Sequence, residues 1–305
     1  MSIQKYIKEI GRGRDGARAL TREQATDLFA QVLNRQATDL EIGAFCVAMR
    51  IKGETVAEMH GFMDAARASM ELIAPSASGC STVVIPCYNG ARRYPVLTPL
   101  LALLLVQRGV RVIMHGVVQE SGRTTSAQVL AALGISPLTS IAQVSDTGVN
   151  FLPIEVLAPS LHWLLRVRYT IGLRNSAHSL VKLMNPCRRR AIVVGSYTHA
   201  EYRVFMDAMY RHLQSDAILL RGLEGEAVAD ARRFQQIDAY IGGQHRCLQQ
   251  AQQERISAMP SWPSDVSAGA TAQYIREIVA GAQVAPPPVL AQVSLLEQLS
   301  QQVPA

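Results

Sequence analysis

The sequence predicts an α/β protein in which a small helical lobe accompanies a larger, doubly wound α/β lobe with a mostly parallel sheet. Three observations support this prediction. Helix-capping patterns recur through the first 74 residues, short apolar runs alternate with helical segments from Thr82 onward, and a second helical region of about Ala158–Leu183 interrupts that alternation. We therefore expect a helical lobe of residues 1–74, completed by a middle segment of about 158–185, and an α/β lobe of residues 75–305.

The N-terminal helices are indicated by their first turns. Thr21, Thr38 and Thr55 are each followed three residues later by Gln or Glu. This is the capping-box pattern, in which the two side chains satisfy the first free N–H groups of a helix. Apolar residues at helical spacing follow Thr21 and Thr55. We expect these stripes to form the core of the lobe, and a stripe left over would be a candidate dimer face.

The strands of the second lobe are predicted from short apolar runs without in-and-out alternation, a pattern that suits parallel strands covered on both faces. These runs are Thr82–Ile85, Arg111–Met114, Ala191–Gly195 and Ala217–Leu220. The tail, Pro260–Pro288, contains several prolines and is followed by a short helix-like stretch, Val289–Leu299.

Composition points to a globular protein. The chain has 305 residues, of which 49% are apolar, enough to bury a full core without disulfides. Its start lacks an apolar segment of signal-peptide length, and the longest apolar run, Leu100–Val106, is too short to span a membrane. The 5 cysteines are spread out without a C-x-x-C pair, which favours reduced packing residues over a disulfide framework or zinc site. We expect a cytoplasmic protein with no membrane partner, no metal and no cofactor.

Positive charge is concentrated in two segments. The net charge is +6, yet residues 72–119 contain four basic residues and residues 156–200 contain seven, and neither segment contains an Asp or Glu. The rest of the chain is therefore mildly acidic. Segregation of this kind favours a polyanionic partner. The alternative is that these arginines simply border a buried sheet.

The loop after the first predicted strand has the position of a phosphate-binding loop. Such loops usually present several glycines, whose backbone N–H groups surround the anion. Here only Gly90 remains, Pro86 has removed one donor, and Arg92 and Arg93 follow. We expect this loop to meet phosphate with side-chain charge rather than to enclose one small phosphate ester in backbone.

Several motifs in order along the chain resemble those of the anthranilate phosphoribosyltransferase and pyrimidine nucleoside phosphorylase superfamily. Together they cover roughly residues 18 to 230: Leu20–Ala25, Met49–Thr55, Met114–Gly116, Ala158–His162, Ile171–Asn175 and Leu183–Pro186. Met114-His115-Gly116 is similar to that family's Lys-His-Gly phosphate motif, and Arg174 matches the arginine that contacts anthranilate in the enzymes. The resemblance implies the two-lobed fold and a homodimer formed through the helical lobe.

Two departures from the enzymes concern the donor site. The enzymes hold the pyrophosphate of phosphoribosyl pyrophosphate in a Gly-Thr-Gly-Gly-Asp loop, where this chain has Pro86-Cys87-Tyr88-Asn89-Gly90. The Asp-Glu pair that binds magnesium in the enzymes falls near Leu223-Glu224-Gly225-Glu226, where two carboxylates remain but are not adjacent. The resemblance therefore implies a kept scaffold with an erased phosphoribosyl site.

This combination resembles the nucleic-acid-binding, non-enzymatic branch of the superfamily. The expected function is binding of single- or double-stranded DNA or RNA without sequence preference, through backbone phosphates in a basic groove. The alternative is an enzyme, a phosphoribosyltransferase or nucleoside phosphorylase acting with an altered donor site. His115-Gly116, Arg174 and Glu224 favour that alternative.

The nucleic-acid hypothesis assigns candidate contacts and no catalytic residue. The contacts are Lys5, Lys8, Arg12, Arg14, Asn89, Arg92, Arg93, Arg123, Arg166, Arg174, Lys182, Arg188 and Arg189. Tyr88, His115, Gly116 and Glu224 are expected to line the cleft.

Several of these assignments have a plainer structural alternative. The basic start of the chain is either a mobile arm or a helix that leads into the lobe. Asn89 either binds phosphate or forms the turn. Arg188-Arg189-Arg190 is either a phosphate clamp or a solvated loop. Arg166 and Arg168 are two residues apart on a predicted helix, about 200° around it, so they cannot share a face and we expect at most one of them to face the groove.

Overall fold

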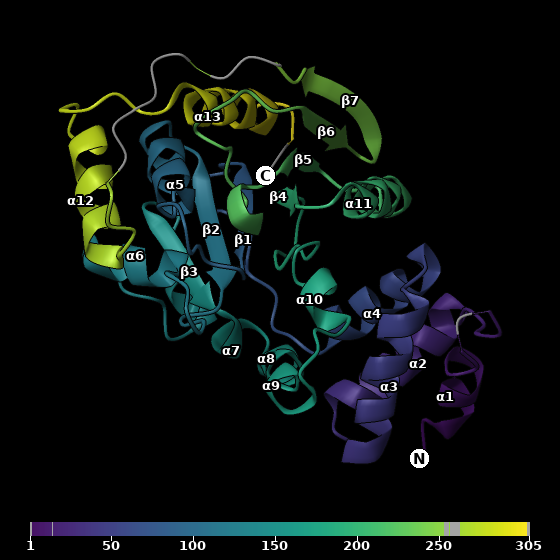
Figure 1. The fold of residues 1–305 in the computed structure, drawn as a ribbon. Coiled ribbons are helices and arrows are strands. Elements are labelled where there is room, and N and C mark those ends of the chain that lie inside the picture. Colours follow the sequence, from purple (N-terminus) through teal and green to yellow (C-terminus); the bar gives the residue numbers. More distant parts are fainter. Residues whose placement is uncertain (1, 14, 253–255, 257–262, 304–305) are drawn as a thin grey trace. The chain divides into compact units, whose positions relative to one another are not determined.

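A computed structural model describes residues 2–13, 15–252, 256 and 263–303 of the chain (Figure 1). The chain divides into two compact units, each described here by itself. The helical unit contains Met1–Leu72 and Ile154–Pro186, and the α/β unit contains Ile73–Pro153 and Cys187–Ala305.

The helical unit is built from two separate stretches of chain. Its helices are α1 (Gln4–Ile10), α2 (Arg22–Leu33), α3 (Asp39–Lys52), α4 (Val56–Ala68), α7 (Ile154–Leu157), α8 (Pro159–Arg166), α9 (Arg168–Ile171) and α10 (Ala177–Leu180). Phe29, Phe45 and Phe62, from α2, α3 and α4, are fully buried against one another, with the rings of Phe29 and Phe62 stacked 4.6 Å apart. Three aromatic rings from three helices thus form the centre of this core.

All three predicted capping boxes are confirmed. The Thr21, Thr38 and Thr55 hydroxyls each accept a hydrogen bond from the backbone N–H three residues later. The side chain of the Gln or Glu at that later position accepts one from the backbone N–H of the threonine. The expected starts of α2, α3 and α4 are therefore correct to the residue.

The α/β unit contains one sheet of seven strands in the order β3-β2-β1-β4-β5-β6-β7. Neighbouring strands from β3 to β5 are parallel, and β5–β6 and β6–β7 are antiparallel. The strands are β1 (Thr82–Cys87), β2 (Arg111–Gly116), β3 (Val149–Pro153), β4 (Ile192–Tyr197), β5 (Ala217–Arg221), β6 (Ile237–Ile241) and β7 (Gln244–Gln249). The α/β fold class with a mostly parallel, doubly wound sheet is confirmed.

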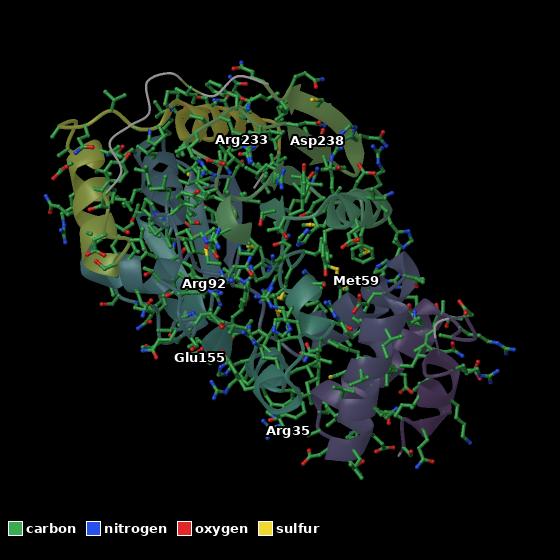
Figure 2. All side chains as sticks on the ribbon, in the orientation of Figure 1. Arg35, Met59, Arg92, Glu155, Arg233 and Asp238 are labelled. Atoms are coloured by element: carbon green, nitrogen blue, oxygen red, sulfur yellow. The ribbon has the colours of Figure 1, made fainter. Side chains whose placement is uncertain are left out.

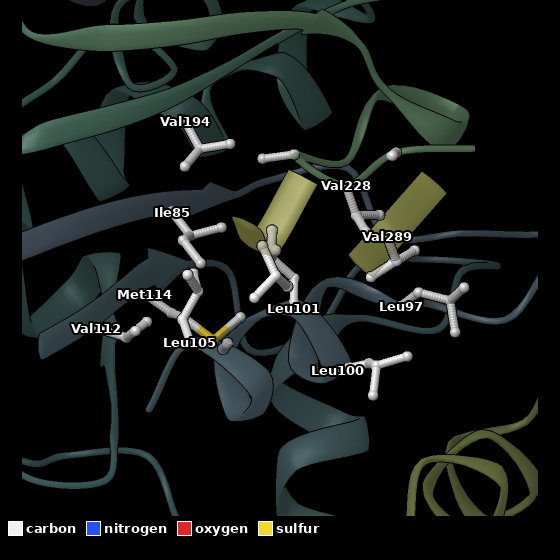
Figure 3. Close-up of a cluster of buried hydrophobic side chains, with 14 of the residues drawn as sticks. Ile85, Leu97, Leu100, Leu101, Leu105, Val112, Met114, Val194, Val228 and Val289 are labelled. Atoms are coloured by element: carbon white, nitrogen blue, oxygen red, sulfur yellow. The ribbon is translucent and has the colours of Figure 1, made fainter. Parts of the chain in front are cut away.

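Helices pack on this sheet and build its main core. They are α5 (Thr98–Gln107), α6 (Ser126–Ala132), α11 (Ala200–His212), α12 (Ala268–Val279) and α13 (Pro287–Ser300), with short 3-10 turns η1 (Ile141–Gln143) and η2 (Leu223–Gly225). Figure 3 shows how Leu101 and Leu105 of α5 meet Ile85 of β1 and Met114 of β2 in a cluster of buried side chains. The apolar α5 therefore anchors the loop that precedes it to the sheet.

The four predicted strands are present, and each continues one or two residues beyond its predicted C-terminal end. Three strands were not predicted: β3 contains Asn150 and ends at Pro153, β6 contains Asp238, and β7 is polar and mostly exposed. The tail contains a further helix, α12, and its first proline, Pro260, lies outside the described residues.

The middle helical segment contains several short helices. Helix α8 ends at Arg166 and α9 begins at Arg168, with Val167 between them in a helical conformation. The guanidinium groups of Arg166 and Arg168 both lie over the ring of Tyr169, 5.5 and 4.9 Å from its centroid. That at most one of them faces the groove stays a prediction.

The basic start of the chain forms a helix over residues 4–10, so this part is not an arm. Ile3, Tyr6 and Ile10 are buried, while Lys5 lies 3.8 Å from Asp27 and Arg12 donates to Glu9. Arg14 lies outside the described residues.

Two further expectations concern the membrane and the cysteines. No helix among the described residues is long and apolar enough to cross a membrane. The five cysteines are free: Cys46, Cys87 and Cys187 are buried and Cys80 is half-buried, but Cys247 is exposed on β7 and is not a packing residue.

Candidate functional site

The loop that follows β1 lies at the point where the strand order reverses. Strand β1 pairs with β2 on one side and with β4 on the other. The strands β2 and β3 therefore lie on one side of β1, and the strands from β4 onward lie on its other side. Open α/β sheets bind ligands beyond the carboxyl ends of their strands at such a point. We define the donor loop as residues 88–94, and the segment after β5 that contains η2 lies against it.

Glu226 holds the first half of the donor loop from inside the protein. Its Oε1 accepts hydrogen bonds from the backbone N–H groups of Asn89 (2.9 Å) and Gly90 (2.8 Å). Its Oε2 accepts from the hydroxyls of Thr98 (3.3 Å) and Ser126 (3.1 Å). The carboxylate is 2% exposed. Glu226 is thus a buried anion that occupies amide groups of the kind that bind phosphate.

Glu224 holds the second half of the loop. Its Oε2 accepts from three successive backbone N–H groups, those of Arg92 (2.9 Å), Arg93 (3.1 Å) and Tyr94 (3.4 Å). Unlike Glu226, it is only half-buried. Its backbone has φ 51°, in the left-handed region that a residue with a Cβ seldom adopts. The side chain reaches the three amides from a strained position.

Two turns keep the loop and the η2 segment in contact. Asn89 donates through its side chain to the carbonyl of Gly225, so this side chain joins the loop to the η2 segment. A Cβ on Gly225 would lie 2.5 Å from the Asn89 amide nitrogen, which makes glycine necessary there. The Arg123 guanidinium donates to the carbonyl of Gly90 at 3.0 Å. Arg123 therefore supports the loop.

The side chains of Arg92 and Arg93 extend from this loop into solvent. Figure 2 labels Arg92 among the side chains of the molecule. Within the part of the chain that the structure describes, neither guanidinium lies within 4.0 Å of a carboxylate oxygen. Two cationic side chains therefore flank a backbone segment whose N–H groups face a carboxylate.

The His-Gly motif at the end of β2 is structural in this chain. His115 is fully buried, and its Nδ1 lies 2.7 Å from the hydroxyl of Tyr88, itself 8% exposed. Burial raises the pKa of Tyr88 well above its usual value. A Cβ on Gly116 would lie 1.9 Å from the carbonyl oxygen of Cys87, so only glycine fits between β2 and β1. Tyr88 and His115 support the loop from beneath and do not line an open cleft.

The two carboxylates do not form a magnesium site in this conformation. A hard cation needs several oxygens that point to one place. Glu226 points into the protein and Glu224 points onto the loop amides, so both oxygens of Glu226 and the Oε2 atom of Glu224 already accept from N–H and O–H donors. No group of three or more His, Cys, Asp or Glu side chains suited to a metal occurs among the described residues. These residues do not fit the metal that the resemblance implies.

The remaining described candidate contacts belong to other segments of the chain. Lys5, Lys8, Arg12, Arg166, Arg174 and Lys182 belong to the helical unit, and Arg188 and Arg189 are exposed in the α/β unit before β4. Their neighbour Arg190 forms a two-bond ion pair with Asp216. Within the described part of the α/β unit, the structure brings together Asn89, Arg92, Arg93, Arg123 and Glu224. It adds Glu226, whose role no local motif indicates.

The chain is similar to known proteins in both sequence and fold. The helical bundle domain of a glycosyl transferase family matches residues 4–70. The chain is 36% identical over 291 residues to the uncharacterized protein YbiB of Escherichia coli K12, covering 94% of this chain and 90% of that protein. It is 30% identical over 244 residues to the anthranilate phosphoribosyltransferase of Haloferax volcanii, covering 77% of this chain and 71% of that enzyme.

Two further matches extend the comparison. The anthranilate phosphoribosyltransferase of Halobacterium salinarum is 30% identical over 226 residues, covering 72% of this chain and 65% of that enzyme. The crystal structure of anthranilate phosphoribosyltransferase from Thermus thermophilus has the same fold, with a TM-score of 0.73 at 19% identity, covering 99% of this chain and 88% of that one.

These matches correct the predicted function. The expectation of a DNA- or RNA-binding protein without catalytic activity is wrong, because the relatives named for an activity are enzymes that transfer a phosphoribosyl group. From its 30% identity to the Haloferax volcanii enzyme over 71% of that enzyme's length, we conclude that the chain belongs to the anthranilate phosphoribosyltransferase-like superfamily.

Proposed function

We propose that this chain is a phosphoribosyltransferase-like enzyme with an altered donor site, one that receives a single phosphate group instead of a magnesium-bound pyrophosphate. Membership of the superfamily supports transfer of a ribosyl group at its anomeric carbon. The altered donor is the part that this chain's own residues support.

The engagement of Glu226 carries this proposal. A carboxylate that is 2% exposed and accepts two backbone N–H and two hydroxyl donors is a fixed part of the loop. Its negative charge repels a second anion from the amides of Asn89 and Gly90. The amides left for an external anion are then those of residues 92–94, which donate to the half-buried Glu224 and lie beside two arginines. That area suits one phosphate group.

Two reactions of the superfamily are compatible with such a site. In one, a nitrogen nucleophile forms a bond to the anomeric carbon of a ribose that carries phosphate there, the C–O bond to the phosphate breaks, the phosphate leaves with the electron pair, and the nitrogen then gives up a proton. In the other, inorganic phosphate attacks the anomeric carbon of a nucleoside, the C–N bond breaks, and the base leaves with the electron pair and takes up a proton. In both, the loop would position a phosphate and neutralise its charge through Arg92 and Arg93.

The test is calorimetric titration of the full chain with phosphoribosyl pyrophosphate, ribose 5-phosphate and inorganic phosphate, each with and without Mg²⁺. Release of base from nucleosides plus phosphate, and consumption of phosphoribosyl pyrophosphate with aromatic amines, are followed by chromatography. We expect saturable binding of a phosphate compound that does not depend on Mg²⁺, accompanied by one of these reactions.

A matched pair of variants locates the site. Replacing Arg92 and Arg93 with Ala should weaken phosphate binding at least tenfold, whereas the same change at Arg188 and Arg189 removes equal charge elsewhere and should leave it unchanged. Tight binding of phosphoribosyl pyrophosphate only with Mg²⁺ would refute the altered donor. Neither binding nor turnover with any of these compounds would refute the enzyme proposal altogether.

A further inference from the structure

The Glu224 carboxylate lies where an external anion would bind. Its residue holds it there with a backbone conformation that a residue with a Cβ seldom adopts. One oxygen, Oε2, accepts all three hydrogen bonds from residues 92–94, at 2.9, 3.1 and 3.4 Å, and the last is long for an N–H donor. The residue that supplies this oxygen has a left-handed backbone, φ 51° and ψ 20°. Three backbone N–H groups that converge on one oxygen form a site of the kind that binds an anion.

The contrast with Glu226 shows which carboxylate can leave. Glu226 uses both oxygens, is 2% exposed and bonds to two side-chain hydroxyls as well as two amides. Glu224 is half-buried, and the hydrogen bonds given for its side chain all come from the loop amides. Water can therefore reach the Glu224 contact, and its displacement would leave the Glu226 contact in place.

We infer that Glu224 is an internal substitute for a phosphate group, and that phosphate displaces it from the amides of Arg92, Arg93 and Tyr94. This inference rests on the proposed function only for the identity of the substrate that carries the phosphate. Substrate binding and release of the η2 segment are then one event, because the same amides cannot bind both anions. In the absence of substrate, Glu224 keeps the site closed.

The charges around the loop favour this exchange. A phosphate monoester carries nearly twice the charge of a carboxylate at neutral pH and has three terminal oxygens, one for each N–H. The guanidinium groups of Arg92 and Arg93 are exposed beside these amides, and neither pairs with a carboxylate within the described chain. Their positive charges attract the incoming phosphate dianion. Glu224 does not use this attraction, because it forms no ion pair with either arginine.

The experiment compares phosphate binding by the full-length wild type, Glu224→Gln and Glu224→Gly by calorimetry with inorganic phosphate and with ribose 5-phosphate. The glutamine keeps the size of the side chain and removes its charge, and the glycine suits the left-handed backbone. We expect both variants to bind phosphate at least tenfold more tightly than the wild type, since the internal competitor is weakened or gone. Thermal melting of each variant establishes that it is folded.

Glu201→Ala is the matched control. Glu201 is an exposed acid in the first turn of α11, so the change removes the same charge from the same unit without freeing a loop amide. Phosphate affinity of this variant should equal that of the wild type. An equal gain in Glu201→Ala would mean that net charge alone is responsible and would overturn the inference.

Amide resonances give a second, independent readout. In ¹⁵N spectra of the wild type, added phosphate should shift the backbone amides of Arg92, Arg93 and Tyr94 and leave those of Asn89 and Gly90 unmoved, because Glu226 still holds them. Shifts confined to other residues, or unchanged affinity in both Glu224 variants, would overturn the inference. Because these measurements need no turnover, a gain in phosphate binding without any ribosyl transfer would refute the proposed function and leave this inference intact.

Discussion

At the scale of single residues, Glu226 shows how a charge can be fully buried and still stabilise a fold. Its carboxylate joins Asn89 and Gly90 of the donor loop to a segment more than 130 residues away. Four donors surround it, which is the condition under which a buried anion is tolerated. The loop conformation therefore depends on this one side chain.

Glu226→Ala should lower the free energy of unfolding by about 3 kcal/mol, since two buried N–H groups lose a charged acceptor. Urea denaturation followed by circular dichroism measures the loss. Glu201→Ala, an exposed acid in the same unit, should stay within about 0.5 kcal/mol of the wild type. Equal stability of the two variants would show that Glu226 is not the structural anchor of the loop.

His178 makes the stability of the helical unit depend on pH. Burial and the positive charges of Arg174, Arg168 and Lys182 lower its pKa from 6.5 to about 3. Its pKa is lower in the folded than in the unfolded chain, so its contribution to stability is complete above pH 6.5 and is lost as the pH falls toward 3.

Between pH 7.5 and pH 5.5 this histidine should therefore cost the fold about 1.4 kcal/mol, which urea denaturation at the two pH values measures. His178→Asn removes the titrating group, so the variant should lose correspondingly less stability over the same interval. A variant with the full pH dependence of the wild type would place the effect on another group.

At the scale of secondary-structure elements, two capping boxes of the same pattern differ in the further contacts that their glutamates make. Glu41 at the start of α3 is half-buried and also accepts from the hydroxyl of Ser2. Glu58 at the start of α4 is fully buried, accepts from the backbone N–H of Leu20 and forms an ion pair with Lys52 at 2.6 Å. The second box therefore ties three segments of the helical unit together.

Glu41→Ala should cost about 1 kcal/mol, the usual effect of losing a helix cap. Glu58→Ala should cost about 4 kcal/mol, because it also leaves the nearly buried ammonium of Lys52 without its partner. Both values come from chemical denaturation under one set of conditions. Losses of similar size would mean that the contacts of Glu58 with Leu20 and Lys52 contribute little.

These two boxes also show what could be predicted from the sequence. The Thr-x-x-Glu pattern is local, so it places the starts of α3 and α4 correctly. The contact between Glu58 and Leu20 spans 38 residues and depends on how the helices pack. Strand β7 was missed for a related reason, because a polar edge strand is specified by its pairing with β6 and not by its own composition.

At the scale of the whole molecule, the position of the candidate site was predictable and its content was not. The strand-loop-helix pattern after Thr82 identifies the loop at the strand-order reversal. The anions that occupy that loop come from a segment after β5, and no periodicity links residues so far apart. The basic residues suggested a polyanion, but several of them pair with the chain's own acids, as Arg190 does with Asp216.

The predicted assembly of two copies also belongs to this scale, and we propose that the helical unit forms the homodimer. The support is an exposed apolar stripe on α3: Leu40, Val47 and Ile51 are 88%, 38% and 61% exposed. They are spaced seven and four residues apart, so they share one face of the helix. A second copy with the same stripe would cover it by twofold symmetry.

Sedimentation equilibrium of the wild type should therefore give twice the mass of the chain. Leu40→Asp combined with Ile51→Asp should shift the protein to a monomer with little change in melting temperature, because both side chains already face solvent within one copy. Val204→Asp provides the control, since Val204 is 71% exposed on α11 of the α/β unit and should leave the dimer intact. A wild type that sediments as a monomer at all concentrations would show that the stripe on α3 is not a dimer face.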